Sequence, residues 1–100
     1  MSVRVTTFQI PPDQLSKALQ VAEEVAVPAM RQQDGFRGHI DLVDRANGKA
    51  VSLTFWDNEA DITAGESSGY YREQVARFAS YVTAQPTREI YEVSTIDLQQ

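Results

Sequence analysis

Residues 35–61, GFRGHIDLVDRANGKAVSLTFWDNEAD, decide the fold of this 100-residue chain. Two segments rich in apolar and β-branched residues, 36–44 and 50–56, flank Asn47-Gly48. That dipeptide is the strongest short signal for a β-hairpin, because both residues tolerate positive φ. Asp57 or Asn58 then caps a short helix that runs through Gly65. The stretch predicts two antiparallel strands followed by a helix.

The sequence before this stretch predicts a strand and a long helix. The strand runs from Val3 to Ile10 and ends at Pro11-Pro12. The helix runs from Asp13 to about Gln33, with Gly35 as its stop. Because Pro28 interrupts the helical pattern, we expect a kink or a restart near Val27.

The sequence after it predicts a further helix and a last strand. Ser67 or Ser68 caps the helix, and the strand spans Arg88 to Ile96. The buried face of the helix is marked by Tyr71, Val75, Phe78, Ala79 and Val82. The order strand, helix, strand, strand, helix pair, strand is the split βαβ pattern of a ferredoxin-like α+β fold. It predicts a single domain, residues 1–100, with a four-stranded antiparallel sheet and helices on one face.

Composition narrows the classes of function. The chain contains no cysteine and one histidine, so we expect no disulfide and no metal cofactor. The formal net charge of −5 disfavours binding to nucleic acid. No apolar segment is long enough for a signal peptide or a membrane span, so we expect a cytoplasmic protein that does not act at a membrane.

The hairpin also predicts which side chains share a face of the sheet. With a two-residue turn, Ile40 lies opposite Phe55 and Leu42 opposite Leu53, an apolar face suited to the helices. A four-residue loop would change these partners but keep the same faces, whereas a three-residue loop would not. The other face would be half apolar, and an identical sheet could cover it in a two-fold homodimer. Its predicted interface residues are Val5, His39, Asp41, Val43, Thr54 and Trp56. The sequence leaves open whether the tail from Ser94 to Gln100 crosses to the other subunit.

The chain resembles the antibiotic biosynthesis monooxygenase (ABM) family of the dimeric α+β barrel superfamily. The resemblance rests on DGFRGHIDLVD, SLTFWDNEADITA, SSGYYREQVARFASYV and REIYEV, and it extends from Val3 to about Val93. It implies a dimer whose sheets form a barrel and a cavity between sheet and helices in each protomer. It also implies oxidation of aromatic, polyketide-like substrates by O₂ without metal or flavin.

A related branch of the superfamily degrades haem and uses an Asn in the first strand and a Trp and a His in the helical region. Thr6, Gly65 and Gln74 occupy about those positions here. Glutamine is a poor iron ligand and glycine cannot press on a porphyrin. The resemblance therefore does not extend to haem degradation, and no cofactor is expected.

Three side chains are candidates for catalysis: His39, Tyr70 and Arg77. Histidine is the residue type best suited to act as a base at neutral pH, and His39 has Asp41 two residues along the same face, but a dimer contact is the favoured alternative. Tyr70 and Arg77 share a helical stripe with Gln74 and Tyr81, which could hold a phenolic or anionic ligand or form an exposed helix edge. Trp56 could stack on a planar ligand or anchor the end of the sheet.

Two functions follow. The first is a cofactor-independent monooxygenase acting on a small aromatic or phenolic substrate. Its implied ligand-binding residues are Thr6, Phe8, Ile62, Tyr71 and Phe78. The alternative is a non-catalytic dimeric module that binds a small ligand or serves in a stress response.

Overall fold

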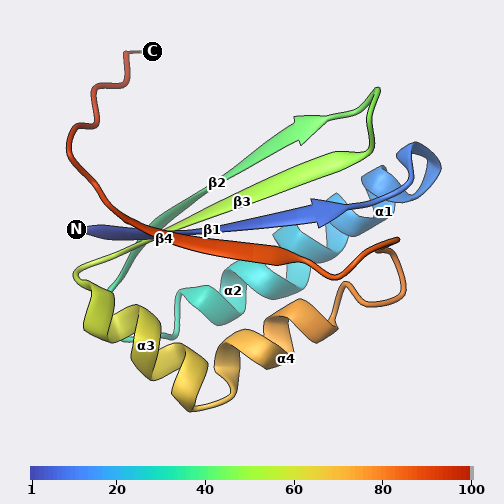
Figure 1. The fold of residues 1–100 in the computed structure, drawn as a ribbon. Helices are drawn as coiled ribbons and strands as arrows, with labels where there is room; N and C mark the ends of the chain where they lie inside the picture. The colour runs from blue at the N-terminus through green and yellow to red at the C-terminus, as the bar shows by residue number, and fades with distance from the viewer. Residues whose placement is uncertain (100) are drawn as a thin grey trace.

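The computed structural model describes residues 1–99 as a four-stranded antiparallel sheet with all helices on one face (Figure 1). The strand order is β2-β3-β1-β4, which confirms the ferredoxin-like α+β fold. The elements are β1 (Ser2–Gln9), α1 (Pro12–Val21), the π-helical turn η1 (Ala22–Ala26), α2 (Val27–Met30), β2 (Phe36–Asp44), β3 (Lys49–Trp56), α3 (Glu59–Ser67), α4 (Tyr70–Ala76) and β4 (Thr87–Glu92).

The first helical region is interrupted just before Pro28. Pro28 has no N–H to donate and its ring crowds the carbonyl four residues earlier, so regular α-helix is unfavourable there. The chain responds with the π-helical turn η1, in which the Val27 N–H bonds to the carbonyl of Ala22, and α2 begins at Val27. The predicted restart near Val27 is confirmed.

The hairpin between β2 and β3 has a longer turn than predicted. Asp44 pairs with Lys49, so four residues, 45–48, form the loop, and the two-residue turn is wrong. Only Gly48 of the loop has positive φ. Asp44 Oδ1 and Oδ2 accept hydrogen bonds from the backbone and side-chain N–H groups of Asn47, which lowers the pKa of Asp44. This side-chain-stabilised turn replaces the two-residue turn and sets Ile40 opposite Leu53.

Gly48 is the position of this turn least able to accept a side chain. Its φ is +64°, and a Cβ there would collide with the carbonyl oxygen of Ile10, whose N–H bonds to Gly48 O at 2.7 Å. We expect Gly48→Ala to lower the free energy of unfolding by about 1–3 kcal/mol. Gly65→Ala is the matched control, because Gly65 lies within helix α3 and a Cβ there makes ordinary contact with Tyr70 at 3.4 Å. It should be neutral or stabilising by up to about 1 kcal/mol in urea unfolding. Equal effects of the two substitutions would contradict this account of the turn.

The predicted assignment of the two sheet faces is wrong. Within β2 and β3 the residues that share a face are as expected, but the face with His39, Asp41 and Thr54 lies under the helices and lines a cavity. Val5 of β1, which was expected on the same face as His39, lies on the other face. The opposite face is open in the protomer and carries Val3, Val5, Ile40, Leu42, Val51, Leu53, Phe55 and Tyr91. The helix-facing positions of β3 before Trp56 are instead small or polar (Ala50, Ser52 and Thr54), which leaves room for a cavity, and the bulkier aliphatic side chains lie on the open face.

Trp56 anchors one end of the helix-facing side. It is 2% exposed, its ring packs edge-on against Phe36 with centroids 5.5 Å apart, and its Nε1 donates to Thr54 Oγ1 at 2.9 Å. Leu15 and Ile62, both with no exposed surface, are the other largest fully buried side chains. Of the two interpretations of Trp56, the structure supports the anchor.

The two helices after Trp56 are capped by different means. Asn58 caps α3 by accepting a hydrogen bond from the Asp61 N–H at 3.0 Å, as predicted. The predicted serine N-cap of α4 is wrong: Gly69, at φ 89°, occupies the N-cap, and the Ser68 hydroxyl accepts from the Tyr70 N–H at 3.3 Å. Glycine is needed because the turn between the helices passes through the left-handed region.

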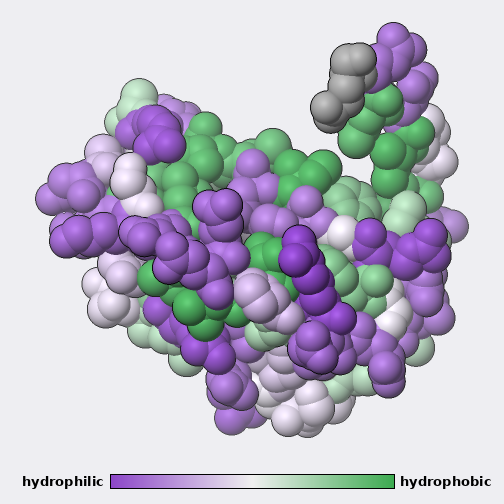
Figure 2. All heavy atoms as spheres, turned by 180° about the vertical axis from the view of Figure 1, so that it is seen from behind, coloured by the Kyte–Doolittle hydropathy of each residue, from purple (hydrophilic) through white to green (hydrophobic). Residues whose placement is uncertain are grey.

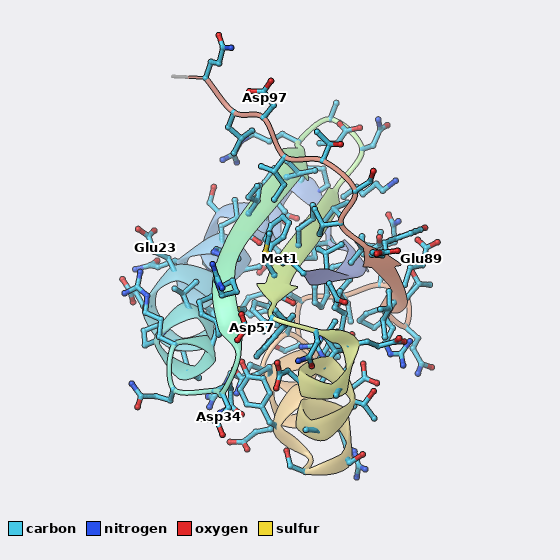
Figure 3. The ribbon with its side chains drawn as sticks, turned by 90° about the vertical axis from the view of Figure 1, so that its left-hand side faces the viewer. Met1, Glu23, Asp34, Asp57, Glu89 and Asp97 are labelled. Atoms are coloured by element: carbon cyan, nitrogen blue, oxygen red, sulfur yellow. The ribbon has the colours of Figure 1, made fainter. Side chains whose placement is uncertain are left out.

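The last strand ends earlier than predicted. β4 pairs with Ser2–Thr7 of β1, and the last backbone hydrogen bond between the two segments joins the Val93 N–H to the carbonyl of Met1. Residues 94–99 extend away from the sheet on the side opposite the helices, and Asp97 lies far from the helical layer (Figures 1 and 3). Ile96 and Leu98 on this tail are 48% and 71% exposed. Gln100 lies outside the described residues.

Candidate functional site

A cavity lies between the helix-facing side of the sheet and the helical segments α1–α2 and α4. The space inside it that the centre of a water-sized molecule can occupy is about 70 Å³, several times what one water needs. Asp41 lines the cavity and is also exposed, so the cavity reaches the surface beside β2.

The roof of the cavity is graded from polar to apolar along the strands. Cross-strand pairing places Arg4, Thr54 and His39 in a first row and Thr6, Ser52 and Asp41 in a second. The third row consists of Phe8, Ala50 and Val43, of which Phe8 and Ala50 line the cavity. The helices continue this gradient: among other residues they contribute Leu19, Ala22 and Met30 from the first helical region, and Tyr70, Tyr71, Gln74 and Phe78 from α4 and the turn after it. An amphipathic ligand would therefore place its polar end near the first two rows.

His39 and Asp41 form a pair on the edge strand β2. His39 Nε2 lies 3.0 Å from Asp41 Oδ2, but the approach is not aligned as a hydrogen bond, and this buried nitrogen has no other partner in residues 1–99. We regard the pair as a close electrostatic contact, because the distance is short while the direction is poor. An imidazole beside a carboxylate at a cavity wall is the arrangement of a general base.

Two tyrosines contribute hydroxyl groups from α4. Tyr71 Oη and Thr6 Oγ1 share a hydrogen bond of 2.9 Å across the cavity. Burial raises the pKa of Tyr70, and the positive charges of Arg4 and Arg77 only partly oppose this. The Tyr70 phenol therefore stays neutral at physiological pH and can donate a hydrogen bond to an oxygen atom of a ligand.

The raised pKa of Tyr70 predicts a pH dependence of stability. The native state keeps the phenolic proton at pH values where the unfolded chain releases it. The contribution of the buried Tyr70 hydroxyl to the free energy of unfolding is therefore fully present below about pH 10 and is lost as the pH rises further. Tyr70→Phe should lessen this decrease when the free energies of unfolding at pH 9 and pH 11 are compared. The comparison is best made with Tyr91→Phe in both proteins, because the hydrogen bond from Tyr91 to Glu89 also raises the pKa of Tyr91. An unchanged decrease would contradict the burial of the Tyr70 hydroxyl.

A cluster of charges closes the cavity next to β1. Glu66 of α3 binds Arg88 through two contacts of 2.7 Å, and it lies 3.5 Å from Arg4 Nη1. Arg4 is 3% exposed, and its guanidinium carbon lies 3.9 Å from the centroid of the Tyr71 ring and 5.7 Å from that of Trp56. Burial lowers the pKa of Arg4, and Tyr71, Glu66 and Tyr70 oppose that effect. The side chain remains charged, since the ordinary pKa of arginine is far above neutrality.

The structure brings together most of the residues that the sequence singled out for ligand binding. Thr6, Phe8, Tyr71 and Phe78 line the cavity, whereas Ile62 is fully buried and does not. That the four residues bind a ligand stays a prediction.

Two of the three catalytic candidates line the cavity and the third does not. His39 and Tyr70 line the cavity. Arg77 lies outside it, where it is exposed, donates to Gln74 Oε1 at 3.2 Å and approaches Glu73 at 3.6 Å. Gln74 itself is buried at the cavity wall. The exposed helix edge is therefore the better description of Arg77.

The predicted interface residues lie on two different faces of the sheet. Only Val5 lies on the open face. His39, Asp41, Val43, Thr54 and Trp56 alternate to the helix-facing side, so they could not meet an identical sheet packed against the open face. His39 thus belongs with the cavity. Sequence reasoning missed Arg4, whose only signal was a charged residue in the centre of an otherwise apolar and hydroxyl-rich strand.

Two further observations concern partners. In residues 1–99 no group of three or more His, Asp and Glu side chains is arranged to hold a metal ion. None of the described helices has the length and apolar character needed to cross a membrane.

The fold and the cavity define a ferredoxin-like α+β domain with a ligand-sized site between sheet and helices. The family model for antibiotic biosynthesis monooxygenases matches residues 1–77, and the chain belongs to that family. A comparison with curated proteins found no match.

Solved structures of other proteins share the fold. A monooxygenase from the gene ActVA-Orf6 of Streptomyces coelicolor, solved in complex with Nanaomycin D, is 16% identical, with a TM-score of 0.81 over 99% of this chain and 92% of that one. SnoaB, a cofactor-independent oxygenase from Streptomyces nogalater, is 12% identical, with a TM-score of 0.70 over 95% and 94%. Rv0793 from Mycobacterium tuberculosis is 16% identical, with a TM-score of 0.69 over 99% and 98%. At these identities the likeness establishes the fold.

Proposed function

We propose that this protein is a cofactor-independent monooxygenase that acts on a small aromatic or phenolic substrate. Membership of the family supports the class of reaction, and two structural neighbours are described as a monooxygenase and a cofactor-independent oxygenase. The observation that carries the proposal is the His39–Asp41 pair at the wall of an otherwise largely apolar cavity. Such a pair can remove a proton from a substrate that apolar walls shield from water.

The chemistry requires only the substrate, O₂ and a base. His39 removes a proton from an activated CH₂ group, as in an anthrone, and leaves a carbanion delocalised over the rings. The carbanion reduces O₂ and forms a C–O bond, which gives a hydroperoxide. Loss of water then leaves a carbonyl, so one oxygen atom enters the substrate and the other leaves as water with the two hydrogens of the CH₂ group. The neutral hydroxyl of Tyr70 can hydrogen-bond to the substrate oxygen on which negative charge accumulates.

A homodimer accompanies this proposal. The open face of the sheet presents an aliphatic and aromatic surface, and hydrophobic side chains gather on that upper side of the molecule, next to the tail (Figure 2). An apolar sheet face that is exposed to water is unfavourable, and packing a second layer against it removes this cost. We propose that a second copy of the chain supplies this layer through its own open face.

The test of the monooxygenase is O₂ consumption with an anthrone or a hydroquinone as substrate, measured above the uncatalysed rate. We expect one ¹⁸O atom from ¹⁸O₂ in the quinone product of the anthrone. His39→Ala should lower kcat/KM by about 100–10,000-fold, the usual contribution of a general base. Glu23→Gln is the control, because Glu23 is exposed on the outer side of the first helical region (Figure 3). No turnover with any of a broad panel of electron-rich phenols would contradict the proposal.

A non-catalytic ligand-binding module is the second candidate. The observation in its favour is the poor alignment between His39 and Asp41, since an oriented base usually receives a directed hydrogen bond. This function predicts that an aromatic ligand raises the melting temperature without forming product. Native mass spectrometry of the freshly purified protein would report a co-purified ligand and the dimer together. A role in a stress response stays a prediction from the sequence.

A further inference from the structure

Arg4 holds a positive charge in the first row of the cavity roof. Its side chain is 4% exposed, its backbone pairs with the central strand β3, and its guanidinium lies over the Tyr71 ring. The Tyr71 hydroxyl is itself tied to Thr6, so the surface beneath the guanidinium is fixed. Arg4 is therefore held in place before any ligand arrives, which lowers the entropy lost on binding.

The charge of Arg4 is not balanced within the protein. Glu66 is the one carboxylate in contact with Arg4 in the part of the chain that the structure describes, and it is engaged by Arg88 through a two-pronged contact with both distances at 2.7 Å. The separation of 3.5 Å from Arg4 is at the limit of a hydrogen bond. Two arginines and one glutamate leave a net charge of +1 beside the cavity. A buried charge that shares its one contacting carboxylate with a second arginine is incompletely neutralised, so this site favours an anion.

Arg4 also has hydrogen-bond donors to spare. An arginine carries five N–H groups, and the contact with Glu66 is the only side-chain hydrogen bond that Arg4 makes within residues 1–99. The remaining N–H groups belong to a residue that lines the cavity. An oxygen anion next to them would gain charge-assisted hydrogen bonds in a site with little water, where such bonds are strongest.

The rest of the cavity defines the remainder of the ligand. Phe8, Phe78, Met30 and Leu19 form apolar walls beyond the polar rows. Asp41 lies in the second row of the roof, and the whole chain has a formal net charge of −5, so a multiply charged anion such as a phosphate ester is disfavoured. The site fits one negative oxygen on an otherwise apolar, planar molecule.

We propose that Arg4 is an anion-binding residue that anchors the carboxylate or enolate oxygen of an aromatic ligand in this cavity. The charged end lies against Arg4, and the rings extend along the strands toward the apolar walls. This orientation is a property of binding, so it holds for a catalytic and for a non-catalytic protein. His39 lies in the same row as Arg4, two strands away at about 10 Å, so it is beside the row that holds the charged end of the ligand.

Two pairs of probes test the proposal by equilibrium binding, measured by calorimetry without turnover. The first pair is 2-hydroxy-1,4-naphthoquinone, an enolate anion at neutral pH, and the neutral 2-methoxy-1,4-naphthoquinone. The second pair is 2-naphthoate and 2-naphthamide. We expect the protein to bind the anion of each pair about 10–100-fold more tightly than its neutral counterpart, the usual effect of a charged hydrogen bond. A preference within one pair alone identifies the anion, enolate or carboxylate, that the site accepts.

Three variants locate the effect. Arg4→Gln should abolish the preference for the anion, and Glu66→Gln should increase it, because Glu66 competes with the ligand for Arg4. Arg31→Gln is the control, since Arg31 is exposed and does not line the cavity, and the substitution removes the same charge. Opposite effects at positions 4 and 66 would not arise from a merely structural ion pair. Circular dichroism establishes that each variant is folded.

Two results would overturn the proposal. One is equal binding of the anionic and neutral probes by the unmodified protein, which needs no variant. The other is a preference that persists in folded Arg4→Gln. The proposed oxygenase activity is tested separately. Anion-selective binding without O₂ consumption would contradict the oxygenase and support the anion site. Turnover without selectivity for the anion would support the oxygenase and contradict the anion site.

Discussion

Replacing Trp56 by alanine should lower the free energy of unfolding by about 3–5 kcal/mol, the cost of deleting a large buried aromatic side chain. Trp56 is 2% exposed, packs against Phe36 and ties its ring nitrogen to Thr54. Its loss would leave a cavity at one end of the helix-facing side and an unpaired Thr54 hydroxyl. Urea unfolding followed by circular dichroism measures the change.

The neighbouring residue provides the control. Phe55 points to the opposite face of the sheet and is only partly buried within the protomer. Phe55→Ala should therefore cost much less at low protein concentration, where dissociated protomers dominate, and more as the concentration rises and dimers form. A large, concentration-independent loss for Phe55→Ala together with a small one for Trp56→Ala would reverse the assignment of the two faces.

The second large effect concerns association. Leu53 lies on the open face in a row with Val5 and Ile40, at the centre of β3. Leu53→Glu would bury two carboxylates, one from each copy, in the proposed interface, at a cost of several kcal/mol per ion. We expect the dissociation constant of the dimer to rise by about 1,000-fold or more, and analytical ultracentrifugation should show monomers at micromolar concentration.

Thr63→Glu is the matched control for this variant. Thr63 is exposed on α3 in the helical layer, away from the open face, and the substitution adds the same charge. It should leave the sedimentation coefficient unchanged. A Leu53→Glu protein that sediments as the unmodified protein does would show that the open face is not the site of association.

The fold could be predicted because several local signals agree. The strands at 36–44 and near 50–56, the asparagine cap at position 58 and the restart at Val27 all follow from residue types with strong conformational preferences. The turn was missed because the choice between two and four loop residues depends on the Asp44 carboxylate, which accepts hydrogen bonds from Asn47. That interaction competes with the Asn-Gly preference and can be judged only once the strands are paired.

The orientation of the sheet could not be predicted for a different reason. Alternation along a strand establishes which side chains share a face, as with Ile40 and Leu42, but not which face the helices cover. The assumption that the more apolar face belongs to the helices fails here because the helix-facing side must also accommodate a cavity. Ala50, Ser52 and Thr54 are too small to fill the space under the helices, and that was the available signal.

The site was only partly predictable. Thr6, Phe8, Tyr71 and Phe78 could be associated with the cavity because aromatic and hydroxyl side chains facing the helices follow from the periodicity and the family resemblance. Arg4 was missed because a lone arginine in a strand usually marks an exposed face. Its burial depends on Glu66 and Tyr71, which are more than sixty residues away in the sequence.

The graded roof of the cavity has a practical consequence for redesigning selectivity. Each row comes from fixed cross-strand neighbours, so exchanging one row alters a single depth of the chamber and leaves the others in place. Enlarging Ala50 in the third row would shorten the chamber and exclude longer molecules, while the head-group contacts near Arg4 stay as they are. Chain-length discrimination and head-group chemistry can thus be tuned separately on the same scaffold.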